Sequence, residues 1–191
     1  MIENIKQEKL AKAKKMMLLF GLLSITMTFA GLTSAYIVSK GRPDWTMDFN
    51  LPSEFFYSTF IILLSSFTLF LSKRKLNTGK SINSVFNWTL ATFILGTVFI
   101  VFQFIGFNSI IDQGYYFAGA QSAIKTSFIY VLSFLHIVHL VAGLIVLIIL
   151  MFNIKKGKYV DNNLGFNLGS NFWHFLDFLW LYLFSFFYFF G

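Results

Sequence analysis

The last twenty residues, FWHFLDFLWLYLFSFFYFFG, contain an imidazole and a carboxylate inside an otherwise apolar run. His174 and Asp177 are three residues apart, so they share one face of a helix with Trp173 and Trp180. An imidazole can donate an N–H to a neighbouring carboxylate, which lowers the cost of burying both groups. The spacing therefore predicts a buried hydrogen bond between His174 and Asp177 that ties the last helix to its neighbours.

Two more histidines and one amide lie in other apolar runs: His136 and His139, again three residues apart, and Gln103. Intramembrane imidazoles can hold helices together, ligate a metal or haem, or conduct protons. At a rise of 1.5 Å per residue, His136 and His139 are expected about 14–18 Å from the outer edge of the membrane, and the pair in the last run about 5–10 Å from the inner edge. Ligands of one metal ion lie within about 2 Å of it, so a shared site is not expected.

These heights favour helix packing as the role of all seven buried polar and indole side chains, namely Gln103, His136, His139, Trp173, His174, Asp177 and Trp180. No catalytic, cofactor-binding or metal-binding residue is predicted. The chain has no cysteine, which excludes disulfides, thiolate metal sites and thiol nucleophiles.

The elements that must position these residues are membrane-spanning helices. The chain of 191 residues is 57% hydrophobic and 12% charged, about half the charge of a soluble domain. A membrane helix needs roughly 20 apolar residues, and five runs qualify. They are residues 16–38, 55–72, 86–111, 127–152 and 171–190. The predicted fold is an all-α membrane bundle of five transmembrane helices forming a single domain over residues 1–191.

Basic residues alternate between the connections and predict the orientation. Three segments hold 12 of the 15 basic residues: Lys6, Lys9, Lys12, Lys14 and Lys15; Lys73, Arg74, Lys75 and Lys80; and Lys155, Lys156 and Lys158. The opposite side carries the acids Asp44, Asp48, Glu54 and Asp112. The positive-inside rule then places the N-terminus in the cytoplasm and the C-terminus outside. This arrangement argues against nucleic-acid binding, which needs basic groups on a solvated face.

The first apolar run is expected to be a retained span rather than a signal peptide. It is longer than the 7–15 apolar residues of a signal peptide, and Tyr36-Ile37-Val38 is a poor cleavage site. The basic segment 1–15 before it fits either a helix on the anionic inner surface or a solvated tail. Within the run, small residues four apart predict close helix contacts at Ser24, Thr28, Gly31 and Ala35.

Four stretches carry a resemblance to a known family. WHFLDFLWLYLF, residues 173–184, resembles the last helix of subunit III of haem-copper terminal oxidases, and SFLHIVHLVAG, residues 133–143, is similar to the helix before it. FAGLTSAYIVSKGRPDW, residues 29–45, and FIVFQ, ending at Gln103, fit the first and third helices of the five-helix bacterial form of that family.

The resemblance implies an accessory subunit without haem or copper in its own chain, in a multi-subunit, proton-translocating oxidase of aerobic respiration. Its expected partners are the haem-bearing catalytic subunit I, the copper-bearing subunit II and membrane phospholipid, in the bacterial cytoplasmic membrane. The resemblance is also compatible with membership of a larger respiratory assembly. The chain would stabilise subunit I and have no catalytic activity by itself.

Several functions remain open at this point. Cytochrome c is the first expectation for the electron donor, with a quinol oxidase or the accessory protein of nitric oxide reductase as alternatives. A haem-binding anchor and a small transporter are the rivals outside the family. The chain also departs from the family, because Ile25 and Gly106 stand where two glutamates are usual, which weakens any direct role in proton relay.

Overall fold

The computed structural model describes residues 2–42, 45, 52–78, 81–115, 117, 124–159 and 163–190 of the chain. Five α-helices make up nearly all of this part: α1 (Ile2–Ser39), α2 (Glu54–Asn77), α3 (Ile82–Asp112), α4 (Ile124–Lys155) and α5 (Leu164–Phe190). Each of the five is long and apolar enough to cross a membrane. The predicted all-α fold of five spanning helices is therefore confirmed.

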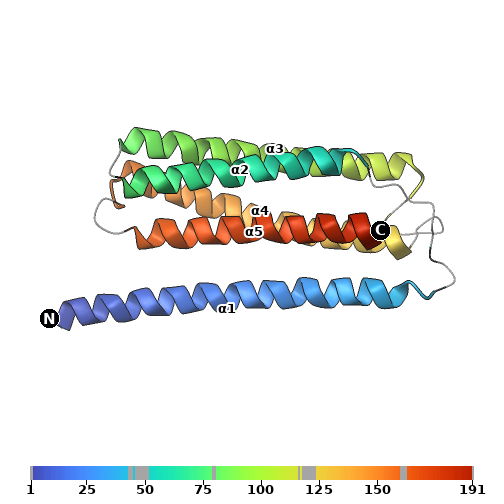
Figure 1. Cartoon of the computed structure of the whole chain (residues 1–191), viewed down its shortest axis with the longest axis horizontal. Helices are drawn as coiled ribbons and strands as arrows, with labels where there is room; N and C mark the ends of the chain where they lie inside the picture. The colour runs from blue at the N-terminus through green and yellow to red at the C-terminus, as the bar shows by residue number, and fades with distance from the viewer. Residues whose placement is uncertain are drawn as a thin grey trace.

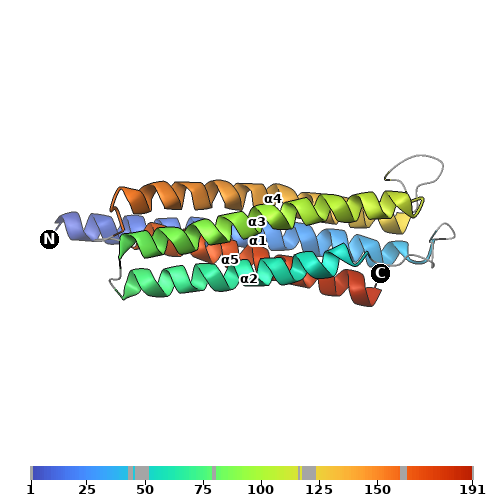
Figure 2. The ribbon, with the colours of Figure 1, turned by 90° about the horizontal axis from the view of Figure 1, so that it is seen from above.

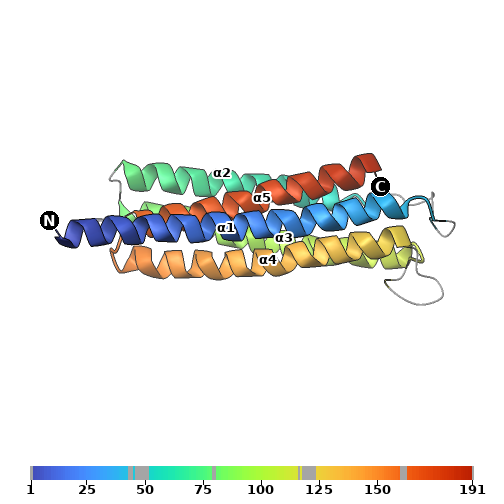
Figure 3. The same cartoon turned by 90° about the horizontal axis from the view of Figure 1, so that it is seen from below.

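The helices run antiparallel to their sequence neighbours, side by side along one axis (Figure 1). Helix α5 packs against α1, α2 and α4, whereas α4 and α5 are the only described helices against which α1 packs. Helices α2 and α3 lie on one side of the bundle and α1 on the other (Figure 1), and the views from above and below place α2 and α4 at the two edges (Figures 2 and 3). Helix α5 is therefore the element that joins α1 and α4 to α2.

The basic connections lie at the same end of the bundle as the N-terminus (Figure 1). We call this the basic end. Segment 2–15 is helical and continues α1 without a break, so α1 is 38 residues long, about 57 Å at 1.5 Å per residue. Several residues used in the charge argument and the motifs, namely Pro43, Asp44, Asp48 and Lys80, lie outside the described residues, as do Met1 and Gly191.

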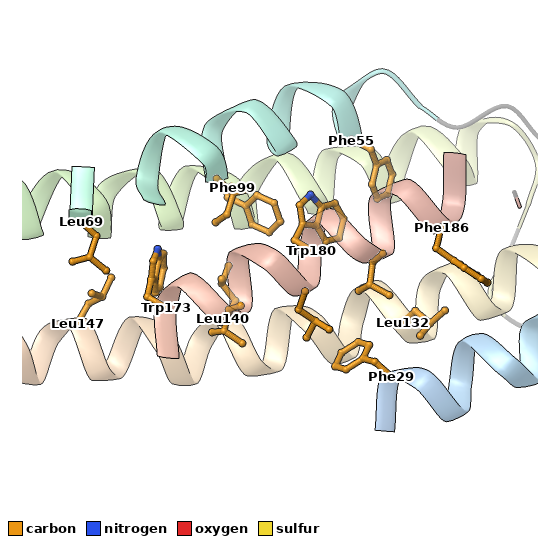
Figure 4. Packing of buried hydrophobic residues seen from close by; sticks show 14 of the residues in the cluster. Phe29, Phe55, Leu69, Phe99, Leu132, Leu140, Leu147, Trp173, Trp180 and Phe186 are labelled. Atoms are coloured by element: carbon orange, nitrogen blue, oxygen red, sulfur yellow. The ribbon is translucent and has the colours of Figure 1, made fainter. Parts of the chain in front are cut away.

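The buried side chains repeat every seven residues, the spacing that keeps one face of a helix towards its neighbours in a left-handed bundle. On α2, Phe55, Ile62 and Leu69 alternate with Ser58, Ser65 and Ser72, and all six are at most 1% exposed. On α5 the series is Phe166, Trp173, Trp180 and Phe187. Figure 4 shows the two indoles of α5 among Phe55, Phe99 and Leu140.

Glycines on the neighbouring helices make room for the indole of Trp173. A Cβ atom on Gly96 of α3 would lie 2.6 Å from Trp173 Cη2, and one on Gly143 of α4 would lie 3.2 Å from Trp173 Cε3. The ring cannot easily move aside, because its Nε1–H donates to Ser65 Oγ at 3.1 Å. The close approach of α3 and α4 to α5 therefore depends on these two glycines.

Replacing Gly96 by alanine tests this packing. We expect G96A to lower the free energy of unfolding by about 1–3 kcal/mol, the usual cost of overpacking, as measured by denaturation in mixed detergent micelles. The matched control is G21A, because nothing lies within 4 Å of a Cβ at Gly21. Equal stability of the two variants would contradict the packing described here.

Candidate functional site: the polar seam of α2, α3 and α5

Hydroxyl groups of α2 receive the polar hydrogens of α5. Trp180 Nε1–H donates to Thr59 Oγ1 at 2.9 Å, and Trp173 Nε1–H donates to Ser65 Oγ at 3.1 Å. Ser66 Oγ forms a hydrogen bond of 2.7 Å with His174 Nδ1. These three bonds follow α2 for two turns, so they fix both the register and the rotation of α5 against α2.

Helix α2 is also hydrogen-bonded to α3, through its adjacent face. Gln103 Nε2 donates to Ser58 Oγ at 2.9 Å in a fully buried position. Three further bonds join Thr68 to the Thr92 hydroxyl at 2.8 Å, and Ser72 to the Thr89 hydroxyl and to the Val85 carbonyl, each at 2.9 Å. We call these bonds between α2, α3 and α5 the polar seam.

The predicted hydrogen bond between His174 and Asp177 is wrong. His174 Nδ1 lies 4.0 Å from Asp177 Oδ2, beyond hydrogen-bond range, although both residues do share a face of α5. The physical reason is that Ser66 on α2 lies closer and binds the same nitrogen. The link from His174 to a neighbouring helix therefore runs through Ser66. Neither carboxylate oxygen of Asp177 has a hydrogen-bond partner among the described residues.

The two histidines of α4 have different surroundings. His136 is fully buried, with its ring 5.2 Å from that of Trp180 and 6.0 Å from that of Phe99. His139 is half-buried, and its Nδ1–H donates to the Leu135 carbonyl at 2.7 Å. Within the described part of the chain, no three His, Asp or Glu side chains gather in a group that could hold a metal ion.

The small residues of α1 are not buried against another helix of the described part of the chain. Ser24, Thr28, Gly31 and Ala35 are all exposed, and a Cβ on Gly31 would meet nothing within 4 Å. Helix α1 instead presents Phe29, and on the same face Thr33 and Tyr36, to α4 and α5, because large rings can reach across the wider spacing between these helices. The predicted close helix contacts at these small residues are therefore not formed by burial within the described part of this chain, and they stay a prediction.

Comparison with known proteins decides the family. The model of the family described as cytochrome c oxidase subunit III matches residues 7–191. The chain belongs to the cytochrome c oxidase subunit III family. It is 37% identical over 70% of its length to cytochrome bo(3) ubiquinol oxidase subunit 3 of Buchnera aphidicola subsp. Baizongia pistaciae, covering 67% of that protein.

Two other relatives cover more of the chain. Cytochrome bo(3) ubiquinol oxidase subunit 3 of Pseudomonas aeruginosa is 32% identical over 86% of this chain and 78% of its own length. Cytochrome c oxidase subunit 3 of Bacillus sp. strain PS3 is 29% identical over 84% of this chain and 77% of its own length. The family therefore includes oxidases named for either electron donor, and this chain is a subunit III of the haem-copper oxidase type.

The two positions at which the resemblance led us to expect glutamates are both packed against neighbouring side chains. Ile25 is partly buried against the hydrophobic core. A Cβ on Gly106 would lie 2.8 Å from Phe55 Cε2, so the ring of Phe55 occupies the space that a side chain at this position would need.

The hydroxyls of α2 were missed in the sequence because the predicted buried polar side chains were limited to ionisable groups, Gln103 and two indoles. A signal was present. Ser58, Ser65 and Ser72 recur every seven residues in a span with no charge between Phe55 and Ser72. Serine at every second inward position of a membrane helix indicates hydrogen bonds to neighbouring helices.

A double-mutant cycle on Thr59→Val and Trp180→Phe tests the polar seam. Each change removes one partner of the 2.9 Å hydrogen bond. We therefore expect a coupling energy of about 0.6–1.7 kcal/mol, the range measured for hydrogen bonds between helices of membrane proteins. The control cycle pairs Thr59→Val with Trp173→Phe, whose indole donates to Ser65 instead. Additive effects in both cycles would show that the Thr59 bond contributes nothing to stability.

Proposed function

We propose that this chain is a cofactor-free accessory subunit that packs against the haem-bearing catalytic subunit I of a proton-pumping oxidase, beside the copper-bearing subunit II. It stabilises subunit I in the bacterial cytoplasmic membrane and binds phospholipid. Its N-terminus lies in the cytoplasm, in line with the basic end, and its C-terminus outside.

The exposed surface of α1 is the observation that carries this proposal. In the 18-residue stretch of α1 that is apolar enough to span a membrane, only 11% is buried inside the chain. The corresponding stretch of α5 is 44% buried. The polar groups of α2, α3 and α5 are largely paired with one another, so their role is to hold these helices together. A scaffold that leaves one apolar helix free on most of its surface is suited to contact another membrane subunit.

Removal of the chain tests the accessory role. We expect the purified complex without it to keep its haem absorption and its initial rate of oxygen consumption, but to lose activity faster during sustained turnover. The isolated chain should have no Soret band. A stoichiometric loss of haem on removal, or a Soret band in the chain alone, would contradict the proposal.

Cytochrome c is the proposed electron donor, and quinol is the second candidate, favoured by the two relatives above that are named ubiquinol oxidases. Oxygen consumption by the purified complex, with reduced cytochrome c or ubiquinol supplied separately, distinguishes them. Activity with ubiquinol alone would assign the chain to the quinol type while leaving its accessory role unchanged.

The small face of α1, formed by Ser24, Thr28, Gly31 and Ala35, is proposed as the contact with subunit I, because small residues let helices approach closely. We expect Gly31→Leu to reduce co-purification of the catalytic subunit several-fold. The matched control is Ala30→Leu, which adds a similar side chain at an exposed position roughly a quarter turn away on α1. Equal recovery with both variants would place the contact elsewhere.

A further inference from the structure

Helix α1 projects past the other four helices at the basic end (Figures 1 and 2). Lys15 lines a groove together with Leu164, the first residue of α5, so these two residues lie at the level where α5 begins. At 1.5 Å per residue, Lys6 lies about 13 Å beyond Lys15 along α1. We call residues 5–12 the N-terminal arm. No hydrogen bond, ion pair or ring contact joins a described side chain of the arm to another described helix.

A seven-residue repeat shows which side of α1 is turned towards the bundle. Ala11, Leu18, Ile25 and Leu32 are all partly buried, and they follow one another at intervals of seven residues. Within the arm, residues 5–10 and 12 are exposed, and Ala11 alone is partly buried. The side of the arm that carries Ala11 therefore faces the bundle.

Three lysines of the arm lie on its other sides. At about 100° per residue, Lys6, Lys9 and Lys12 are rotated about 140°, 160° and 100° from Ala11 around the helix axis. All three are exposed, and none has an ion pair among the described residues. The arm therefore presents a stripe of three ammonium groups, one turn apart, that points away from the rest of the chain.

The stripe weakens the helix that carries it. Like charges one turn apart repel each other, and a cation near the start of a helix opposes the macrodipole. Glu8 is the only acidic residue in the arm, so the side chains of residues 5–12 carry a net charge of +2 from three lysines and one glutamate. An anionic surface against the stripe would relieve both effects.

Membrane topology accounts for the number of basic residues at this end but not for this arrangement. The positive-inside rule counts Lys and Arg near the spans, and it does not depend on which side of a helix they occupy. Of the 12 basic residues on this side of the membrane, nine lie outside the stripe and supply the same topology signal. The rigid, outward-facing stripe therefore needs a second explanation.

The membrane surface is a poor partner for the stripe. The arm continues the membrane-spanning part of α1 without a break, so it does not lie along the surface of the bilayer. Lys6 is about 13 Å beyond Lys15, which is farther than the screening length of about 8 Å at physiological salt. Anionic headgroups at the level of Lys15 therefore attract Lys6 only weakly.

The small face of α1 indicates which partner passes beside the stripe. Lys6 precedes Ser24 by 18 residues, which is five whole turns, so the two residues lie on the same side of α1. Ser24 belongs to the small face proposed above as the contact with subunit I. A subunit packed against that face therefore reaches the arm where its chain leaves the membrane.

We propose that the N-terminal arm binds an acidic segment of subunit I at the basic end, through Lys6, Lys9 and Lys12. The contact extends the apolar contact of α1 beyond the bilayer. Charge pairs of this kind fix orientation and specificity more than they add affinity. The inference rests on the proposed function, because it takes subunit I as the neighbour of α1.

Charge reversal of the stripe tests the contact. In the variant K6E/K9E/K12E, we expect the affinity of the complex for this chain to fall about ten-fold, the combined effect of three exposed ion pairs. Occupancy is measured by native mass spectrometry on the complete complex, purified in mild detergent and diluted at low and at high salt. High salt should weaken retention of the unaltered chain and should not weaken retention of the variant.

Two further variants separate the contact from effects on insertion or net charge. The milder K6Q/K9Q/K12Q should lower affinity about three-fold, which is half the effect on a logarithmic scale. The matched control K155E/K156E/K158E makes the same charge change at exposed lysines of the same end, between α4 and α5, and should be retained like the unaltered chain. Equal retention of all four chains, or equal loss from the two reversed variants, would overturn the inference.

A zero-length carbodiimide cross-linker identifies the partner, because it joins an ammonium group to a carboxylate only where the two are in contact. Peptide mass spectrometry of the unaltered complex should find Lys6, Lys9 or Lys12 joined to Asp or Glu of the haem-bearing subunit. No such cross-link, or one to another polypeptide, would overturn the inference while leaving the accessory role intact. Absence of the haem-bearing subunit from the purified complex would instead overturn the proposed function, and with it this choice of partner.

Discussion

An indole N–H or a hydroxyl inside a bilayer is costly to leave without a partner in the protein, because lipid chains offer none. In this chain α2 meets that requirement for α5, since Thr59, Ser65 and Ser66 bind the polar atoms of Trp180, Trp173 and His174. An unpaired group in hydrocarbon costs several kcal/mol, so each bond restricts how α5 can rotate or slide. The glycines of α3 and α4 complete the arrangement, because they let the backbone approach the ring of Trp173.

The two ends of α1 show how such a bundle can leave one helix for other partners. Near its C-terminal end α1 is tied to α5 through Thr33 and Tyr36. Towards its N-terminus it projects past the other helices and carries exposed lysines. The same helix thus combines a fixed attachment to the bundle with surfaces available to a neighbouring subunit.

Hydrophobic length predicted the five helices, because a span in lipid must be long, apolar and helical. Four short stretches, of which the one around Trp173 and Asp177 is the most specific, predicted the family. The partner of His174 could not be predicted, because spacing along one helix shows which residues share a face and not what faces them. The hydroxyls of α2 were predictable in principle from their seven-residue repeat. The partner of Gly31 could not be predicted, because small residues pack equally well inside a chain and between chains.

The hydrogen bonds of the two buried indoles can be observed directly. With ¹⁵N-tryptophan incorporated into this chain in lipid bilayers, the four indole N–H signals can be assigned by single Trp→Phe variants. We predict that the N–H groups of Trp173 and Trp180 exchange with deuterium far more slowly than that of Trp45, and that Thr59→Val accelerates exchange at Trp180 alone. Rapid exchange at both buried indoles in the unaltered chain would contradict the polar seam.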